Sequence, residues 1–126
     1  MVWKVAYHDD LQIVELTISG RVTGPELLEA AASRIDLGQE KGITNYLIDG
    51  TELIPSRSTT LEILEIPEKV YFEKGMERTS RIAAVVPREP ESHWIAEFYE
   101  NASVNRGWRV QWFLNRHDAI GWLLGP

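Results

Sequence analysis

The residues best suited to chemistry lie together in the stretch YLIDGTELIPSRSTTLEIL, which spans residues 46–64. An apolar run typical of a buried strand ends there in Asp49, and a segment rich in Ser, Thr and Arg follows. Hydroxyls, arginines and the free N–H groups at a helix start are the groups with which proteins hold anions and polar head groups. The stretch therefore indicates a ligand site, a switch, or a polar loop that only connects two elements.

A helix cap explains the same loop more simply. Thr59 followed by Glu62 fits a capping box, and Ser58 is an alternative cap. Because such caps are common, the loop by itself favours a structural role over a binding role.

Two further loops are expected at the same edge of the molecule. Ligands of open sheets with parallel strands collect beyond the carboxyl ends of those strands, where helix N-termini converge. The segments after Asp49, Val86 and Leu114 should all emerge there. The ligand or partner site predicted from this convergence consists of Asp49, Thr51, Ser56, Arg57, Ser58, Thr59, Arg88 and Arg116, with Asn115 beside it.

Other catalytic and metal-binding patterns find little support. His93 and Glu97 could share one helical face, but a third ligand with matching spacing is missing, so a solvated helix pair is favoured. The chain contains no cysteine, no G-x-S-x-G elbow and no glycine-rich phosphate or dinucleotide loop. We therefore expect a protein that is not an enzyme and carries no metal or other cofactor, with a hydrolase of unknown type as the least favoured alternative.

The elements that position these residues follow from hydrophobic periodicity. Alternating apolar residues on both sides of His8-Asp9-Asp10 predict an antiparallel hairpin. Thr23 and Glu26 predict a capping box at the start of a helix that ends at Gly38.

Strands and helices then alternate. Apolar strands are expected at 46–49 and 81–86, a helix from Pro90, and a strand at or next to the sheet edge at 108–114 before a closing helix. Because Pro67 disfavours one continuous helix, a turn at 59–65 and a helix at 67–74 are expected, with one kinked helix as the alternative. The expected shared core is Val14, Ile18, Leu28, Ile48, Ala84, Val86, Ile95, Phe98, Val110 and Ile120.

Together these elements predict a single α/β domain over residues 1–126. It would have a mixed sheet of about five strands, an N-terminal β-hairpin and helices packed on the sheet. The order of elements and the segments ISGRVTGPELLEA, YLIDGTEL, RIAAVV and WFLNRHDAIGWL resemble the SpoIIAA-like (STAS-type) family of small bacterial proteins over nearly the whole chain. The resemblance implies two kinds of function. Anti-anti-sigma factors of this fold are phosphorylated on a loop serine that corresponds to Ser58, and Sec14-type lipid-transfer domains of similar architecture enclose an apolar ligand.

The function predicted from these observations is a non-enzymatic binding or regulatory module. It would bind a small apolar or amphipathic ligand, or a protein partner, and the apolar segment 61–74 would either close a pocket as a lid or wrap the core. The alternative is an anti-anti-sigma-like interaction switch controlled by phosphorylation of Ser58. The five tryptophans could line a pocket, but core packing is favoured for them.

Charge and hydropathy limit the partners. A net charge of −6 without any run of Lys or Arg argues against nucleic acid, and no apolar run has the length for stable membrane insertion. The N-terminus does not resemble a signal peptide, so the expected location is cytoplasmic. If the strand at 108–114 has an exposed edge, a homodimer would cover it.

Overall fold

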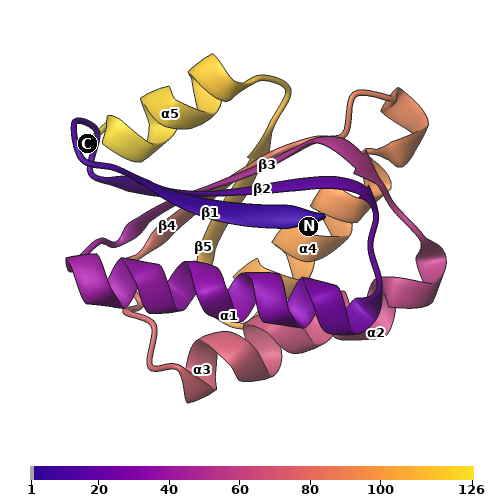
Figure 1. The fold of residues 1–126 in the computed structure, drawn as a ribbon, viewed down its shortest axis with the longest axis horizontal. Helices are drawn as coiled ribbons and strands as arrows, with labels where there is room; N and C mark the ends of the chain where they lie inside the picture. The colour runs from indigo at the N-terminus through magenta and orange to yellow at the C-terminus, as the bar shows by residue number, and fades with distance from the viewer. Residues whose placement is uncertain (1) are drawn as a thin grey trace.

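A five-stranded mixed sheet forms the centre of the computed structural model, which describes residues 2–126. The strands lie in sequence order (Figure 1), and β1 pairs antiparallel with β2, whereas all later pairs are parallel. This confirms the predicted fold class, with its N-terminal hairpin. The strands are β1 (Trp3–His8), β2 (Ile13–Arg21), β3 (Asn45–Ile54), β4 (Arg81–Val85) and β5 (Arg109–Phe113).

Helices cover the two faces of this sheet unequally. Figure 1 shows one face covered by the first four helices and the other by the last helix alone. The helices are α1 (Gly24–Lys41), α2 (Thr60–Glu65), α3 (Tyr71–Glu73), α4 (Trp94–Val104) and α5 (Arg116–Leu124). Because helices lie on both faces, the sheet separates two apolar layers.

The start of α1 is as predicted, but its end is not. Thr23 and Glu26 form a complete capping box. The helix continues past Gly38 to Lys41, and Gly42 takes the left-handed capping conformation with φ of 68°. Gly38 instead allows close packing, since a Cβ there would lie 2.0 Å from the hydroxyl oxygen of Tyr46.

The strand β3 is longer than the predicted range of 46–49. Its extension Glu52–Ile54 pairs with Ser19–Arg21 of β2, beyond a register irregularity between Thr17 and Ser19. Residues 50–54 of the loop expected after Asp49 are therefore strand, and only Pro55 and Ser56 separate β3 from the next helical turn. Long-range pairing with β2 overrides the turn signal of Asp49-Gly50.

Residues 57–73 form one continuous helical segment, so the expected break after residue 65 is wrong and the kinked helix is right. A π-helical turn, Ile66–Val70, accommodates Pro67 between α2 and α3, with the N–H of Tyr71 donating to the carbonyl of Ile66. The carbonyl of Pro67 accepts a hydrogen bond of 2.9 Å from Trp108 Nε1. This contact from Trp108, just before β5, gives the backbone of the irregular turn a hydrogen-bond partner.

The expected single core is divided in two by the sheet. Most of the predicted core residues pack between the sheet and α1 to α4, whereas Ile120 packs on the opposite face beneath α5. The buried members of that second layer are Ile13, Leu47, Ala83, Val85, Ala119 and Leu123.

Candidate ligand-binding site

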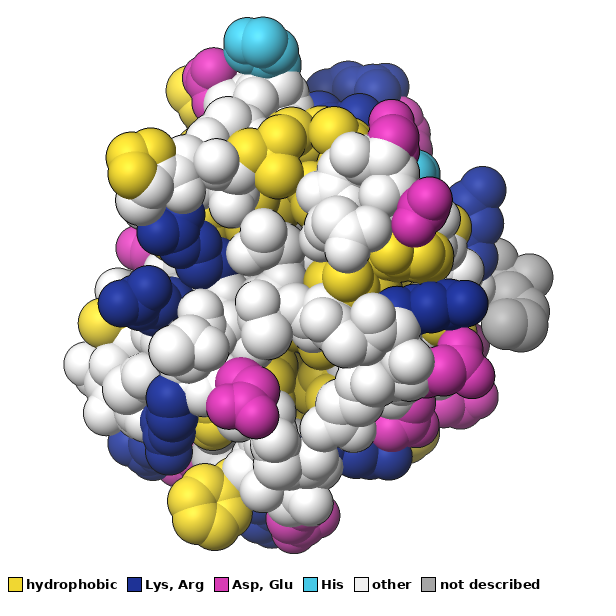
Figure 2. Space-filling model, turned by 90° about the vertical axis from the view of Figure 1, so that its left-hand side faces the viewer, with side chains coloured by type: hydrophobic (Ala, Val, Ile, Leu, Met, Phe, Trp, Pro, Cys, Tyr) yellow, Lys and Arg dark blue, Asp and Glu magenta, His cyan; other side chains and the backbone are white. Residues whose placement is uncertain are grey.

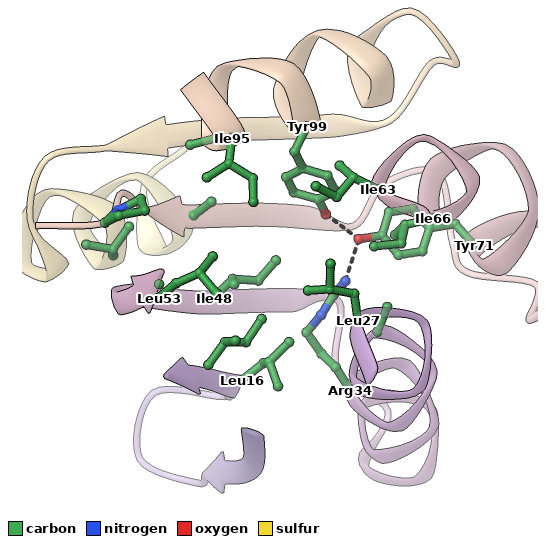
Figure 3. Close-up of a pocket in the computed structure, with 17 residues that line it drawn as sticks. Leu16, Leu27, Arg34, Ile48, Leu53, Ile63, Ile66, Tyr71, Ile95 and Tyr99 are labelled. Carbon is green, nitrogen blue, oxygen red and sulfur yellow. Dashed lines mark hydrogen bonds between the residues drawn. The ribbon is translucent and has the colours of Figure 1, made fainter. Parts of the chain in front are cut away.

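An apolar pocket of about 80 Å³ lies between the sheet and the helices α1 to α4 (Figure 3). Figure 3 shows Leu53 and Ile48 toward one end and Arg34, Tyr71 and Tyr99 gathered at the other. The other lining side chains labelled there are apolar: Leu16, Leu27, Ile63, Ile66 and Ile95. The pocket therefore combines an apolar body with one polar end.

Small residues leave the space that the pocket occupies. Ala31 of α1, Ala84 of β4 and Ala96 of α4 all line it and are all buried. Gly50 of β3 is also needed, since a Cβ there would approach the carbonyl oxygen of Val85 to 3.0 Å. Larger side chains at these positions would close the cavity.

The segment 61–74, expected either to close a pocket as a lid or to wrap the core, contributes residues to this pocket. Ile63, Ile66 and Tyr71 come from the helical segment 57–73 and line the cavity from the helix side. At the opposite end, Ile48 and Leu53 of β3 are half-buried, so the pocket opens toward solvent there. Leu53 near the end of β3 and the buried Pro87 after β4 belong to the carboxyl-end edge of the parallel strands. This edge is where ligands of such sheets are expected.

The polar end of the pocket is built around Arg34, which is only 1 % exposed. Its Nη2 donates to the hydroxyl of Tyr71, which in turn hydrogen-bonds to the hydroxyl of Tyr99. The guanidinium carbon lies 5.1 Å from the ring centroid of Tyr46 and 5.3 Å from that of Tyr71. Arg34 Nε and Nη1 are buried without a hydrogen-bond partner among residues 2–126.

Burial keeps the surrounding phenols neutral. Desolvation raises the pKa of Tyr99 well above its ordinary value and also raises that of Tyr46. Desolvation opposes the charge of Arg34, but the oxygens of Tyr71 and Tyr99 outweigh it and raise the pKa of the guanidinium. At neutral pH the pocket thus ends in the Arg34 cation, with the neutral phenols of Tyr46 and Tyr99 near it.

The residues predicted as a site form two groups elsewhere. Asp49 and Thr51 lie within β3, where Asp49 Oδ1 accepts from the Thr51 N–H at 3.0 Å and from its hydroxyl at 2.8 Å. The backbone N–H of Arg88 donates to the carbonyl of Thr51, and its exposed guanidinium pairs with Glu52 at 2.7 Å. These polar groups are therefore engaged with one another.

Arg116 lies on the α5 side of the sheet, close enough for the charge of Asp49 to act on it. Its Nη2 contacts Glu15 Oε1 at 2.9 Å, and the hydrogen bond to Glu15, then the charges of Glu15 and Asp49, raise the pKa of Arg116. Glu15 is buried, and His8 Nε2 lies 2.7 Å from the same oxygen. This cluster links β1, β2 and α5, so its contribution to holding these elements together explains why Arg116 lies there.

The second group, Ser56 to Thr59, begins the helical segment. Ser56 Oγ accepts from the Ser58 N–H at 3.3 Å and lies 2.8 Å from Ser58 Oγ, while the Thr59 hydroxyl donates to the Ser56 carbonyl at 2.7 Å. The expected Thr59–Glu62 capping box is absent, because Ser56 provides the cap and the Glu62 side chain lies over Gly24. A helix cap is present, as predicted, but Ser56 forms it instead of Ser58 or Thr59.

Arg34, Tyr71 and Tyr99 are the polar pocket residues that the sequence reasoning did not select. The signal that could have found Arg34 is its position on the apolar face of α1, where Leu27, Ala31 and Ile35 are also buried. The tyrosines carried no such signal, since a buried aromatic residue is ordinary core. None of the five tryptophans lines the pocket, although Trp108 contacts Tyr71 at 5.6 Å between ring centroids.

No protein-family model matches this chain, and no curated protein matches it either. Within residues 2–126, no cluster of three or more His, Cys, Asp or Glu side chains is placed to hold a metal ion. No helix of that same range combines the length and apolar character needed to cross a bilayer.

Proposed function

We propose that this protein is a non-enzymatic binding module of SpoIIAA-like type that holds a small apolar or amphipathic molecule. The observation that carries the proposal is the apolar pocket beneath the segment 57–73, with its open end at the carboxyl edge of the strands. Ligand sites are typically concave, mostly apolar and equipped with a few convergent polar groups, and this pocket has that composition.

The size of the pocket limits the ligand. Its volume of about 80 Å³ is smaller than the cavity of about 150 Å³ that admits benzene in an engineered protein. A short apolar chain would fill it, and a longer chain would extend past Leu53 and Pro87 toward solvent. The proposed ligand is therefore narrow rather than bulky.

A matched pair of substitutions on α1 tests the site. Ala31 lines the pocket, whereas its neighbour Ala32 does not and is half-buried. Ala31→Leu should fill the cavity and abolish the rise in thermal unfolding midpoint caused by short- and medium-chain fatty acids, while Ala32→Leu should retain it. Native mass spectrometry of protein isolated from cells would add the mass of a retained ligand. The proposal fails if the parent protein shows no midpoint shift across the fatty-acid series.

One observation favours a second function, the phosphorylation-controlled interaction switch. Ser58 is exposed at the start of the helical segment, beside a groove that contains Arg57, Leu61 and Trp94. Leu61 is 61 % exposed, and the Arg57 guanidinium lies 4.1 Å from the ring centroid of Trp94. A phosphate on Ser58 would attract Arg57 and change the charge of this apolar groove.

Ser58→Asp and Ser58→Ala distinguish the switch from a simple helix cap. If the loop is a switch, Ser58→Asp should lose a co-purifying partner that Ser58→Ala retains, at equal stability. If it is only a connection, the two variants should have the same partners and differ by about 0.5–2 kcal/mol in unfolding free energy at most. Affinity purification from cells, together with chemical denaturation, provides both measurements.

The remaining predictions concern partners and location. Figure 2, which faces the side where α1 ends, shows basic and acidic side chains interspersed, which does not favour nucleic acid as a partner. A homodimer through β5 stays a prediction, and Glu100 already accepts the edge N–H of Trp112 at 2.9 Å. The cytoplasmic location is likewise part of the proposal.

A further inference from the structure

The inference concerns the charge at the closed end of the pocket. Arg34 is the only charged side chain among the pocket-lining residues, and no carboxylate of residues 2–126 forms an ion pair with it. An isolated buried ion is costly, and proteins usually pair such a charge or neutralise it. Arginine cannot be neutralised at ordinary pH.

The protein's own groups compensate this charge only in part. The hydroxyl of Tyr71 accepts one hydrogen bond, and the rings of Tyr46 and Tyr71 face the guanidinium at cation–π distance. Within residues 2–126, the donors of Arg34 Nε and Nη1 have no acceptor. Buried donors without acceptors are rare enough that each requires an explanation.

We propose that the ligand of this pocket is a monocarboxylate with a narrow apolar chain, whose head group binds Arg34. This deepens the proposed function and depends on it. The carboxylate would supply the missing negative charge and the missing acceptors, and the hydroxyls of Tyr71 and Tyr99 lie beside the guanidinium as further polar contacts. The chain would extend along Leu16, Ile48 and Ile95 toward Leu53.

The geometry favours one negative charge over two. A phosphate dianion would bring more oxygens and more charge than one guanidinium and two phenols can satisfy. A neutral alcohol or ester would fit the apolar body but leave the cation uncompensated. The acid should therefore be preferred to its own neutral derivatives.

The experiment compares butyrate, hexanoate and octanoate with their methyl esters, by isothermal titration calorimetry on the unmodified protein. Each acid that binds should do so about 10- to 100-fold more tightly than its ester, as a hydrogen bond to a charged group implies. If acid and ester bind equally, the carboxylate inference is overturned while the pocket function stands. If neither binds, both are overturned.

Substitutions then connect the preference to Arg34. Arg34→Met should bind acid and ester equally and should unfold, without ligand, at the same or a higher temperature, because an uncompensated charge has been removed. Arg34→Lys should keep a weaker preference for the acid. Arg109→Met, which removes an exposed charge on β5, should keep the full preference. An acid preference that survives in Arg34→Met would overturn the inference, and if that variant does not fold, the comparison of acids with esters decides.

Discussion

At the scale of single residues, the pocket depends on groups that ionise far from neutral pH. Tyr99 is buried, its hydroxyl meets that of Tyr71, and Arg34 lies on the other side of Tyr71. Burial raises the pKa of Tyr99, so the folded protein holds this phenol neutral after the unfolded chain has begun to ionise it. The consequence is a stability that depends on pH in the alkaline range.

The sign of that dependence follows from proton linkage. Above about pH 10 the unfolded state binds fewer protons than the folded state, so the unfolding free energy falls as pH rises, by up to about 1.4 kcal/mol per pH unit for each such tyrosine. Tyr99→Phe should make this decline shallower at pH values between the pKa of Tyr99 in the unfolded chain and its raised pKa in the folded protein. Below the unfolded pKa, the substitution should not change how the unfolding free energy depends on pH. Urea denaturation at a series of alkaline pH values measures the slope. An unchanged slope would show that Tyr99 ionises equally in both states.

At the scale of elements, the helical segment 57–73 depends on a contact from Trp108, the residue before β5. Trp108 is 4 % exposed, donates to the Pro67 carbonyl at 2.9 Å and packs edge-on against Tyr71. It therefore supports the π-helical turn Ile66–Val70 that places Ile66 and Tyr71 in the pocket. The pocket and the irregular helix have a common support.

Trp108→Phe should reduce the unfolding free energy by about 2–4 kcal/mol, since a buried carbonyl loses its donor and the core loses volume. Trp122→Phe is the matched control. Trp122 of α5 is half-buried and packs against Phe113 at 5.8 Å between ring centroids, so its replacement by Phe should cost less than about 1.5 kcal/mol. Chemical denaturation of both variants gives the comparison, and equal costs would contradict the supporting role of Trp108.

At the scale of the whole molecule, the central strand β3 serves both apolar layers. Leu47 is fully buried and points to the α5 layer, whereas its neighbour Ile48 is half-buried and lines the pocket on the other face. Adjacent residues of one strand thus serve different purposes, one for folding and one for the site.

Aspartate substitutions separate these purposes. Leu47→Asp should unfold the domain, because an unpaired charge in a fully buried position costs several kcal/mol against a total stability of about 5–15 kcal/mol. Ile48→Asp should leave a folded domain that no longer responds to fatty acids, since its carboxylate reaches the pocket. Circular dichroism and thermal unfolding with and without octanoate test both variants. A folded Leu47→Asp protein would contradict the two-layer arrangement.

The features that local chemistry encodes could be predicted from the amino-acid sequence. The hairpin around His8 and the Thr23–Glu26 capping box were both readable because the groups that form them are neighbours in the chain. The α/β class followed from the alternation of strand and helix periods, which each segment carries in its own residues. Local information was sufficient for the class of fold and for most element starts.

Three features depend on contacts between distant parts of the chain: the end of β3, the path of the helical segment past Pro67, and the choice of polar groups that face a cavity. The pairing of Glu52–Ile54 with β2 and the contact from Trp108 to Pro67 join distant parts of the chain, so local propensities could not reveal them. Arg34 and Tyr71 are separated by 37 residues and Tyr71 and Tyr99 by 28, so no local sequence pattern shows that these three side chains meet. Packing alone places a cation and two phenols at the end of an apolar pocket, because a side chain's role there depends on what the other elements leave open around it.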